Sequence, residues 1–194
     1  MSTLTPSSIP LISAGSLRHI RASIGDDETR LLMIGLPNGG KTSVLTRFSK
    51  KEHALHDMGN QKFRLRNMLH EGLNITVFDV GRDAYIDPYW SEYHYDRVVG
   101  IVFVVDACEP SKMNEAKECF FSILKNEKLN KVPVLIMANK CDVEGSMSSP
   151  KIGEALELHE LKRNKHHIVR TSAVSDEGIQ VGFEWLVGQK FMRE

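Results

Sequence analysis

Short apolar runs alternate with amphipathic stretches along most of this chain. Segments of strand length occur at residues 30–35, 62–69, 73–79, 98–106, 132–139 and 167–171. Stretches with helical spacing follow at 41–51, 91–96, 112–126, 150–159 and 179–193. Several of the strand segments are apolar at consecutive positions, which is typical of strands buried on both faces. The pattern predicts an α/β fold with a doubly wound, mostly parallel six-stranded sheet that binds ligands at the carboxyl ends of its strands.

The second and third predicted strands are separated only by His70, Glu71 and Gly72. Parallel strands need a crossover of a dozen or more residues, so these two strands must form a hairpin. We therefore expect one antiparallel strand at an edge of the sheet.

Residues 1–28 are expected to form an extension before a single domain at 29–194. Leu17, Ile20 and Ile24 can share one helical face, which indicates a short amphipathic helix. A helix docked on the domain or an unstructured arm is an equal alternative. Ser2 in place of glycine speaks against N-myristoylation, and the acidic residues 26–28 weaken attraction to anionic lipid. We expect weak or no membrane contact through this extension.

Composition narrows the class of protein. The chain has 25 Lys and Arg against 25 Asp and Glu, so nothing in its net charge suggests nucleic-acid binding. Its 3 cysteines have neither metal-site nor disulfide spacing and are interpreted as reduced thiols. We find no apolar run near the ~20 residues of a membrane span, and no signal peptide. The expected location is the cytoplasm, with or without peripheral contact with a membrane.

The segment GLPNGGKT at 35–42 follows an apolar run and opens a predicted helix, which fits the phosphate-loop pattern G-x-x-x-x-G-K-[ST]. Its glycines allow backbone N–H groups to surround an anion. Lys41 can reach the outer phosphates, and the Thr42 hydroxyl can ligate Mg²⁺. The predicted phosphate-binding residues are Gly35, Asn38, Gly39, Gly40, Lys41, Thr42 and Ser43.

A second polar segment, NKCD at 139–142, ends another apolar run. The Asp142 carboxylate can accept two parallel N–H bonds from guanine, a pair that adenine cannot offer. Asn139 can tie this segment to the phosphate loop, and the stem of Lys140 can pack along the base. After the run at 168–169, Ser172 and Ala173 lie where a second base-contacting loop is needed. These residues predict a guanine-nucleotide site.

The motifs together resemble those of small GTPases, and within them the Arf and Arf-like branch. The resemblance rests on residues 30–42, 78–81 (FDVG), 88–107, 139–142 and 182–187 (GFEWLV). It implies a P-loop GTPase fold, GTP or GDP with Mg²⁺ as ligands, and Asp79 and Gly81 as part of the site. Asp79 would support the magnesium without ligating it directly.

The same resemblance implies protein partners. Arf-type proteins recruit effectors through aromatic residues, here Phe63, Phe78 and Tyr93, and are served by exchange and activating proteins. Core packing of these three aromatics is an even alternative. The expected role is a recruitment switch in intracellular or membrane traffic.

The chain departs from the family pattern where hydrolysis would occur. The switch-one threonine position corresponds to Asn60, and residues 50–75 contain no Ser or Thr. Where the family has D-V-G-G-Q, this chain has Arg82 at the second glycine and Asp83 at the glutamine that orients water. A carboxylate at that position would repel phosphate. Arg82 and Asp83 are therefore the candidate catalytic positions, and impaired or absent hydrolysis is the favoured interpretation.

Two alternatives remain open from the sequence. One is an ordinary cycling GTPase in which Arg82 acts as a built-in arginine finger. The other is a constitutive scaffold whose nucleotide is structural.

Overall fold

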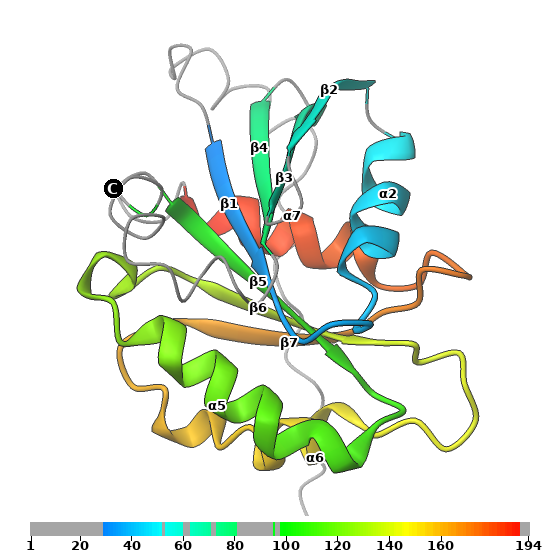
Figure 1. The fold of residues 1–194 in the computed structure, drawn as a ribbon, viewed down its shortest axis with the longest axis vertical. Coiled ribbons are helices and arrows are strands. Elements are labelled where there is room, and N and C mark those ends of the chain that lie inside the picture. The colour runs from blue at the N-terminus through cyan, green and yellow to red at the C-terminus, as the bar shows by residue number, and fades with distance from the viewer. Residues whose placement is uncertain are drawn as a thin grey trace, which may run out of the picture.

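The computed structural model describes residues 29–51, 53–59, 63–70, 73–80, 95 and 98–190. A seven-stranded sheet in the order β2-β3-β4-β1-β5-β6-β7 forms its centre (Figure 1). The strands are β1 (Thr29–Ile34), β2 (His53–Gly59), β3 (Phe63–His70), β4 (Leu73–Val80), β5 (Val98–Asp106), β6 (Val134–Asn139) and β7 (His166–Arg170). The helices are α2 (Lys41–Lys51), α5 (Met113–Leu124), α6 (Ser149–Ala155) and α7 (Ile179–Lys190), with short 3₁₀ turns η1 (Pro110–Lys112), η2 (Glu127–Leu129) and η3 (Leu158–Glu160).

The predicted fold class is confirmed. β4, β1, β5, β6 and β7 run parallel, and the expected hairpin joins β3 to β4 in antiparallel register, with His70 opposite Leu73. Because the strands are parallel, their carboxyl ends meet at one edge of the sheet.

The predicted strand number and edge are wrong. The segment His53–Gly59, for which no strand was predicted, forms β2 and pairs antiparallel with β3. The sheet therefore has seven strands instead of six, and the antiparallel β3 lies inside it. The sequence of β2, HALHDMG, lacks a clear alternation of apolar and polar residues, so it is its pairing with β3 that defines it as a strand.

Helices cover both faces of the sheet, as a doubly wound fold requires. β1 shows the alternation: Leu32 and Ile34 join the core under α5 and α6, while Leu31 and Met33 join the core under α2 and α7 (Figure 1). The position of a residue along a strand thus decides which of the two cores it enters.

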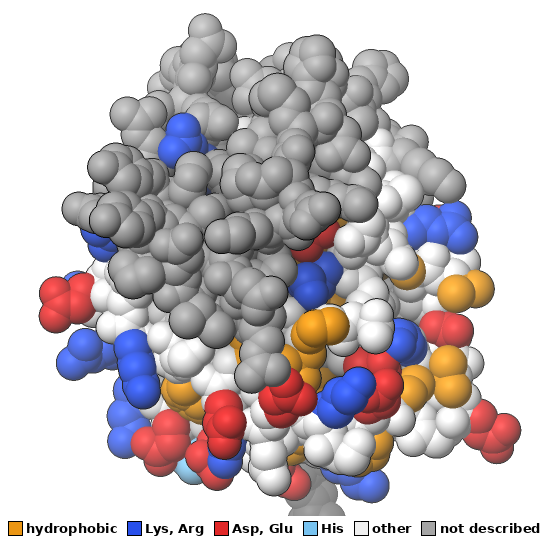
Figure 2. Space-filling model, viewed as in Figure 1, with side chains coloured by type: hydrophobic (Ala, Val, Ile, Leu, Met, Phe, Trp, Pro, Cys, Tyr) orange, Lys and Arg blue, Asp and Glu red, His pale blue; other side chains and the backbone are white. Residues whose placement is uncertain are grey.

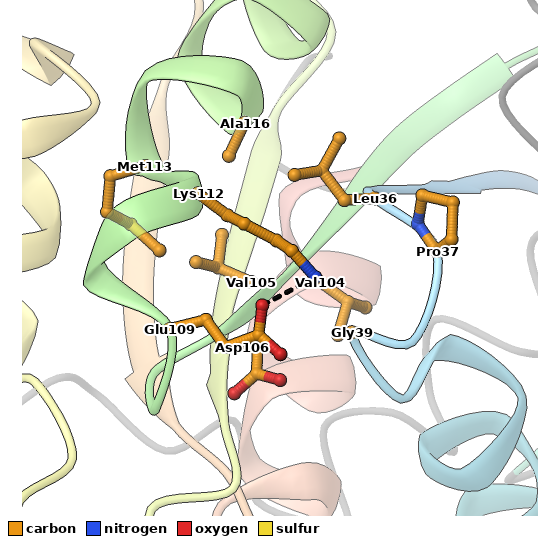
Figure 3. A pocket seen from close by; sticks show the side chains of 10 residues that line it. All are labelled: Leu36, Pro37, Gly39, Val104, Val105, Asp106, Glu109, Lys112, Met113 and Ala116. Atoms are coloured by element: carbon orange, nitrogen blue, oxygen red, sulfur yellow. Dashed lines mark ion pairs between the residues drawn. The ribbon is translucent and has the colours of Figure 1, made fainter.

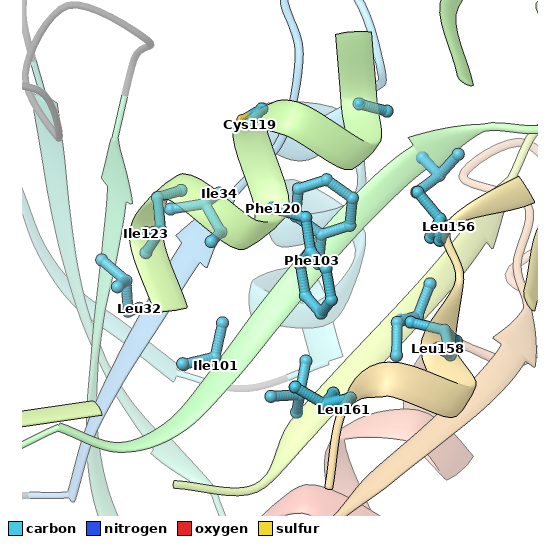
Figure 4. Packing of buried hydrophobic residues seen from close by; sticks show 14 of the residues in the cluster. Leu32, Ile34, Ile101, Phe103, Cys119, Phe120, Ile123, Leu156, Leu158 and Leu161 are labelled. Atoms are coloured by element: carbon cyan, nitrogen blue, oxygen red, sulfur yellow. The ribbon is translucent and has the colours of Figure 1, made fainter. Parts of the chain in front are cut away.

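Aromatic side chains fill the centre of each core. Under α5, the ring of Phe103 lies 4.8 Å from the ring of Phe120 (Figure 4). On the other face, Phe48 of α2 stacks on Phe183 of α7 with centroids 3.8 Å apart. The first pair fixes α5 on the sheet, and the second fixes α2, which begins at the phosphate loop, against α7.

Most element boundaries agree with the predictions to within two residues. Two helices differ by more: the one predicted at 179–193 is described as far as Lys190, and the one predicted at 150–159 ends at Ala155. Glu157 adopts the left-handed conformation (φ 52°), which breaks the helix and starts η3. Leu158 and Leu161 are buried on this turn, so burial has overridden the helical spacing. The predicted helix at 91–96 lies outside the described residues except for Tyr95, as does the extension at 1–28.

Candidate functional site

The phosphate loop turns tightly over the end of β5. A Cβ on Gly35 (φ 143°) would lie 2.3 Å from the Val104 carbonyl oxygen, so only glycine fits there. Asn38 is left-handed (φ 63°), and Gly40 (φ 92°) accepts a 2.9 Å bond from the Val44 N–H that starts α2. The loop therefore wraps closely and ends at the amino terminus of a helix, which favours an anion.

Lys41 lies across this loop. Its ammonium donates to the carbonyl oxygens of Gly35 at 2.9 Å and Leu36 at 3.0 Å. Burial lowers the pKa of Lys41, and the nearby Asp79 carboxylate partly opposes that shift. The charge is thus held beside the curve of the loop, where outer phosphates would lie.

A possible magnesium site is formed by two oxygen groups at the start of α2. The hydroxyl of Thr42 donates to Asp79 Oδ2 at 2.9 Å, and Asp79 is 7% exposed at the end of β4. A hydroxyl that donates its proton keeps lone pairs for a metal, and Mg²⁺ prefers such hard oxygen ligands. The residues present therefore fit magnesium. Ser43, the next residue, is exposed on the first turn of α2.

Asn139 joins the segment at 139–142 to the loop at 35–42, as the sequence suggested. Its Nδ2 donates to the carbonyl oxygen of Gly39 at 2.9 Å, and its Oδ1 accepts from the Thr171 hydroxyl at 3.4 Å. A Cβ on Gly40 would lie 2.2 Å from the same Nδ2, so this approach also requires glycine. The Cys141 N–H donates to Thr171 O at 3.1 Å, which adds the loop after β7 to the assembly.

Lys140 is held by a partner that the sequence analysis did not identify. Its ammonium forms an ion pair with Asp106, the last residue of β5. The other Asp106 oxygen accepts from the Cys108 N–H at 2.9 Å. This arrangement fixes the Lys140 stem, while the Asp142 side chain stays exposed beside it. The position of Asp106 at the carboxyl end of an apolar parallel strand was a usable signal, since site residues gather at that edge.

Cys108 and Cys141 flank this segment. Burial raises the pKa of both thiols, and all three cysteines of the chain are free. A raised pKa disfavours the thiolate, which is the reactive form, so Cys108 and Cys141 are expected to be unreactive.

The loop after β7 carries Ser172 and Ala173. Ser172 is fully buried, and its hydroxyl oxygen accepts the N–H groups of Val174 at 3.1 Å and Ser175 at 3.0 Å. Arg47 of α2 donates to the Ala173 carbonyl oxygen at 2.7 Å. Arg47 carries no motif signal in the sequence, so only the structure shows its contact with this loop.

Hydrogen bonds thus connect four segments: the phosphate loop, α2, the segment 139–142 and the loop after β7. The sequence profile of the ADP-ribosylation factor family (Arf) matches residues 17–190.

The chain belongs to the ADP-ribosylation factor family.

Several curated Arf proteins are similar along most of their length. ADP-ribosylation factor 1 of Brassica rapa subsp. pekinensis and ADP-ribosylation factor 3 of Arabidopsis thaliana are each 34% identical over 169 residues, covering 87% of this chain and 92% of theirs. ADP-ribosylation factor-like protein 3 of Chlamydomonas reinhardtii is 30% identical over 164 residues, covering 84% of this chain and 92% of its own.

A solved structure supports the fold. The small GTPase Arl6 (BBS3) of Trypanosoma brucei, solved with the nucleotide analogue GppNp, has a TM-score of 0.75 and 24% identity, covering 87% of this chain and 100% of that chain. The predicted Arf-like small GTPase fold is therefore confirmed, and the chain belongs to a family of guanine-nucleotide-binding proteins.

Part of the predicted Arf site lies outside the described residues. Gly81, Arg82, Asp83, Asn60 and Tyr93 fall there. The other two residues of the predicted effector surface are on the hairpin, where the backbone register pairs position 63 with 80 and position 65 with 78. Because residues two apart share a face, this register puts positions 63 and 78 on one face of the hairpin.

Two hollows of the described surface lie at either end of α5. A cavity of about 10 Å³ lies between the phosphate loop and α5, enough for about one water, with an ion pair at 2.5 Å between Lys112 and Glu109 beside it (Figure 3). A larger open hollow of about 430 Å³ lies between α5 and the segment before β7, near the amino ends of β6 and β7. That hollow therefore lies at the amino ends of the parallel strands, whereas the phosphate loop lies at their carboxyl ends.

The described residues contain neither a membrane-spanning helix nor a metal-binding cluster of side chains. No helix among them is long and apolar enough to cross a bilayer. No cluster of three or more His, Cys, Asp or Glu side chains there could hold a metal ion by itself. On the described part of the face in Figure 2, acidic and basic side chains are interspersed.

Proposed function

We propose that this Arf-family protein is a guanine-nucleotide-dependent recruitment switch in intracellular or membrane traffic that hydrolyses GTP very slowly or not at all. The observation that carries the binding half is the hydrogen-bonded connection from Gly39 through Asn139 to Thr171. It joins a phosphate-binding loop to two segments that can recognise a base, so one ligand with both parts satisfies the whole assembly.

The bound groups would be held by residues already described. The N–H groups of the phosphate loop and the Lys41 ammonium would hold the phosphates, and Asp142 with Ala173 would hold guanine. Thr42 would ligate Mg²⁺, with Asp79 behind it, and the metal would neutralise phosphate charge. Each role matches a donor or acceptor whose surroundings have been given above.

The hydrolysis half rests on residues 82 and 83. Arg82 replaces a glycine whose N–H would meet the γ-phosphate, and Asp83 replaces a neutral residue that would orient water. A short carboxylate near a polyanion raises the energy of that arrangement through charge repulsion. Asn60 lacks the hydroxyl with which switch one would sense the γ-phosphate.

The test is single-turnover GTP hydrolysis with Mg²⁺. The native chain is expected to turn over below roughly 10⁻⁴ s⁻¹, the order of an unassisted Ras-type protein. The double variant Arg82→Gly/Asp83→Gln should be faster, because it restores the N–H contact and removes the repelling charge. A native rate above that of the double variant would instead mean that Arg82 assists hydrolysis.

Arg82→Ala then distinguishes the first alternative, since loss of an arginine finger costs roughly a thousandfold or more in rate. Affinities for GDP and for a non-hydrolysable GTP analogue are expected to agree within about tenfold. A hundredfold preference for either would contradict the missing γ-phosphate contacts.

Partner binding tests the switch itself. A partner that contacts the surface of Phe63, Phe78 and Tyr93 should bind the two nucleotide states unequally. Equal binding to both states would favour the constitutive scaffold.

A further inference from the structure

Arg47 of α2 contacts the loop after β7 through two hydrogen bonds. Its Nε donates to the Ala173 carbonyl oxygen at 2.7 Å, and its Nη2 donates to the Val174 carbonyl oxygen at 3.1 Å. An ion pair at 3.3 Å joins Nε to Asp176 Oδ1. A planar guanidinium suits such paired acceptors, because its donors are fixed in one fork.

Ser172 holds the same two peptide groups from the other side. Its hydroxyl oxygen accepts the N–H of Val174 at 3.1 Å and the N–H of Ser175 at 3.0 Å. The Ala173–Val174 peptide is thus bonded at its oxygen by Arg47 and at its nitrogen by Ser172, and so is the Val174–Ser175 peptide. Two consecutive peptide planes are fixed at both ends.

Burial holds the start of this loop but not its tip: Ala173 packs against the core under α2 and α7. The Val174 side chain is 74% exposed, so no apolar packing anchors the tip of the loop. The polar contacts of Arg47 and Ser172 therefore add to this packing and fix the two peptide planes that follow Ala173. Among the described residues, no backbone carbonyl accepts the Ala173 N–H.

This geometry has a direct consequence for choosing a base. Guanine carries a hydrogen-bond acceptor, O6, beside the N1–H and N2–H donors that a carboxylate such as Asp142 can accept. Adenine carries a donor amine at the same position 6. A backbone N–H held in a fixed direction therefore attracts guanine and rejects adenine, whereas a loop free to rotate would do neither well.

We infer that Arg47 is a positioning residue for base recognition: it fixes the loop so that the Ala173 N–H meets O6 of guanine. The inference rests on the proposed guanine-nucleotide site, and it adds a residue outside the nucleotide-binding motifs. Arg47 also couples the two halves of that site, because α2 begins at the phosphate loop and Ala173 belongs to the base-recognition side.

Analogues of GDP separate this role from a general structural one. 6-Thio-GDP replaces O6 by sulfur, a weaker acceptor, and keeps both donors. IDP lacks the 2-amino donor and keeps O6. Dissociation constants of the full chain for GDP, 6-thio-GDP and IDP are to be measured by competition with a fluorescent GDP, in Mg²⁺ buffer.

In the native protein, 6-thio-GDP and IDP should each bind at least tenfold more weakly than GDP. In Arg47→Ala, the GDP dissociation constant should rise about tenfold, which is 1.4 kcal/mol. In this variant the dissociation constants for 6-thio-GDP and GDP should agree within threefold, because the O6 contact is already lost. The penalty for IDP should be unchanged, since Asp142 still accepts the donors. Arg163→Ala, an exposed arginine in the hollow at the opposite edge, is the matched control and should alter none of the three.

Two further variants refine the test. Arg47→Lys keeps a charge but not the planar fork. It should therefore also reduce the penalty for 6-thio-GDP relative to GDP, by about threefold. This variant serves as the test if Arg47→Ala does not fold. Asp176→Asn removes only a half-exposed ion pair and should change GDP affinity by less than threefold.

An equal loss of affinity for all three nucleotides in Arg47→Ala and Arg47→Lys would overturn the inference. So would a native protein that prefers GDP to ADP but binds 6-thio-GDP as tightly as GDP; the proposed function would then stand without it. A native protein with no preference for GDP over ADP would instead overturn the proposed function itself.

Discussion

The Lys41 ammonium is bonded to the carbonyl oxygens of Gly35 and Leu36 at 2.9 and 3.0 Å. This contact places a positive charge at the inner curve of the phosphate loop, and burial lowers the pKa of that ammonium. A phosphate near it would favour the charged form and oppose the shift. At the scale of single residues, the site therefore consists of groups whose positions are set by short contacts with the backbone.

We expect Lys41→Ala to weaken GDP and GTP binding at least tenfold while changing GMP binding by less than threefold. The reason is that the ammonium serves the outer phosphates, which GMP lacks. Isothermal titration with all three nucleotides measures the difference. Equal losses for the three would mean that the substitution has damaged the loop instead.

Asp142→Ala should lower affinity for GDP at least tenfold and remove most of the preference over ADP. Each charge-assisted hydrogen bond from guanine to the carboxylate is worth roughly 1.5–3 kcal/mol. Because the Asp142 side chain is exposed, truncation should leave the melting temperature of the nucleotide-free protein within 2 °C, by the usual range for surface substitutions. Equal affinity of the native chain for GDP and ADP would refute the assignment.

The sequence predicted these two residues because their motifs combine a residue type with a fixed spacing. It did not predict Arg47 or the pairing of Asp106 with Lys140. Both are contacts between segments far apart in the chain, and an arginine within a polar helix has the same appearance whether it is solvated or bonded. Asp106 could have been found from its place at the end of β5, whereas Arg47 could not.

Among the elements, β2 is the main addition to what periodicity predicts. The β3–β4 hairpin is flanked on one side by β1, which pairs with β4, and on the other side by β2, which pairs with β3. β2 is the outermost strand on that side and has β3 as its one partner in the described sheet. A strand that depends on one partner is more exposed to opening than one in the middle of a sheet. The sequence did not predict β2, because β2 has no apolar alternation of its own and is a strand only through its pairing with β3.

Hydrogen exchange of the GDP-bound chain should detect this strand. About every second amide of His53–Gly59 is expected to exchange slowly, because antiparallel ladders bond alternate residues to the partner. Their protection should nevertheless be weaker than that of β1, which is paired on both sides. Uniformly fast exchange across residues 53–59 would contradict the pairing with β3.

The whole molecule combines a sheet with helices on both faces and a site on one edge. Its fold class and the contact of segment 139–142 with the loop at 35–42 were predictable, because each depends on local spacing and on the rule that parallel strands align their carboxyl ends. The seventh strand and the connections among the four segments of the site were not, because they arise only when distant parts of the chain pack together.

Nucleotide binding should therefore stabilise the molecule as a unit. GDP at a hundredfold excess over its dissociation constant adds about 2.7 kcal/mol to the free energy of unfolding. For a chain of 194 residues this corresponds to a rise of roughly 5–11 °C in melting temperature. Differential scanning fluorimetry with GDP, and with ADP at the same concentration as the control, measures it. A rise of the same size with ADP would exclude selective guanine binding.

The order of the strands also governs when this site can first exist. β1 and the phosphate loop leave the ribosome early, whereas Asn139 follows Gly39 by 100 residues and the loop after β7 follows later still. An emerging chain therefore carries the proposed phosphate-binding loop before it carries the segments proposed to select a base. Ribosome-bound chains arrested with residues up to 165 exposed should not retain fluorescent GDP, and chains exposed through α7 should. Nucleotide capture by such arrested chains would then report the moment at which β7 joins the sheet.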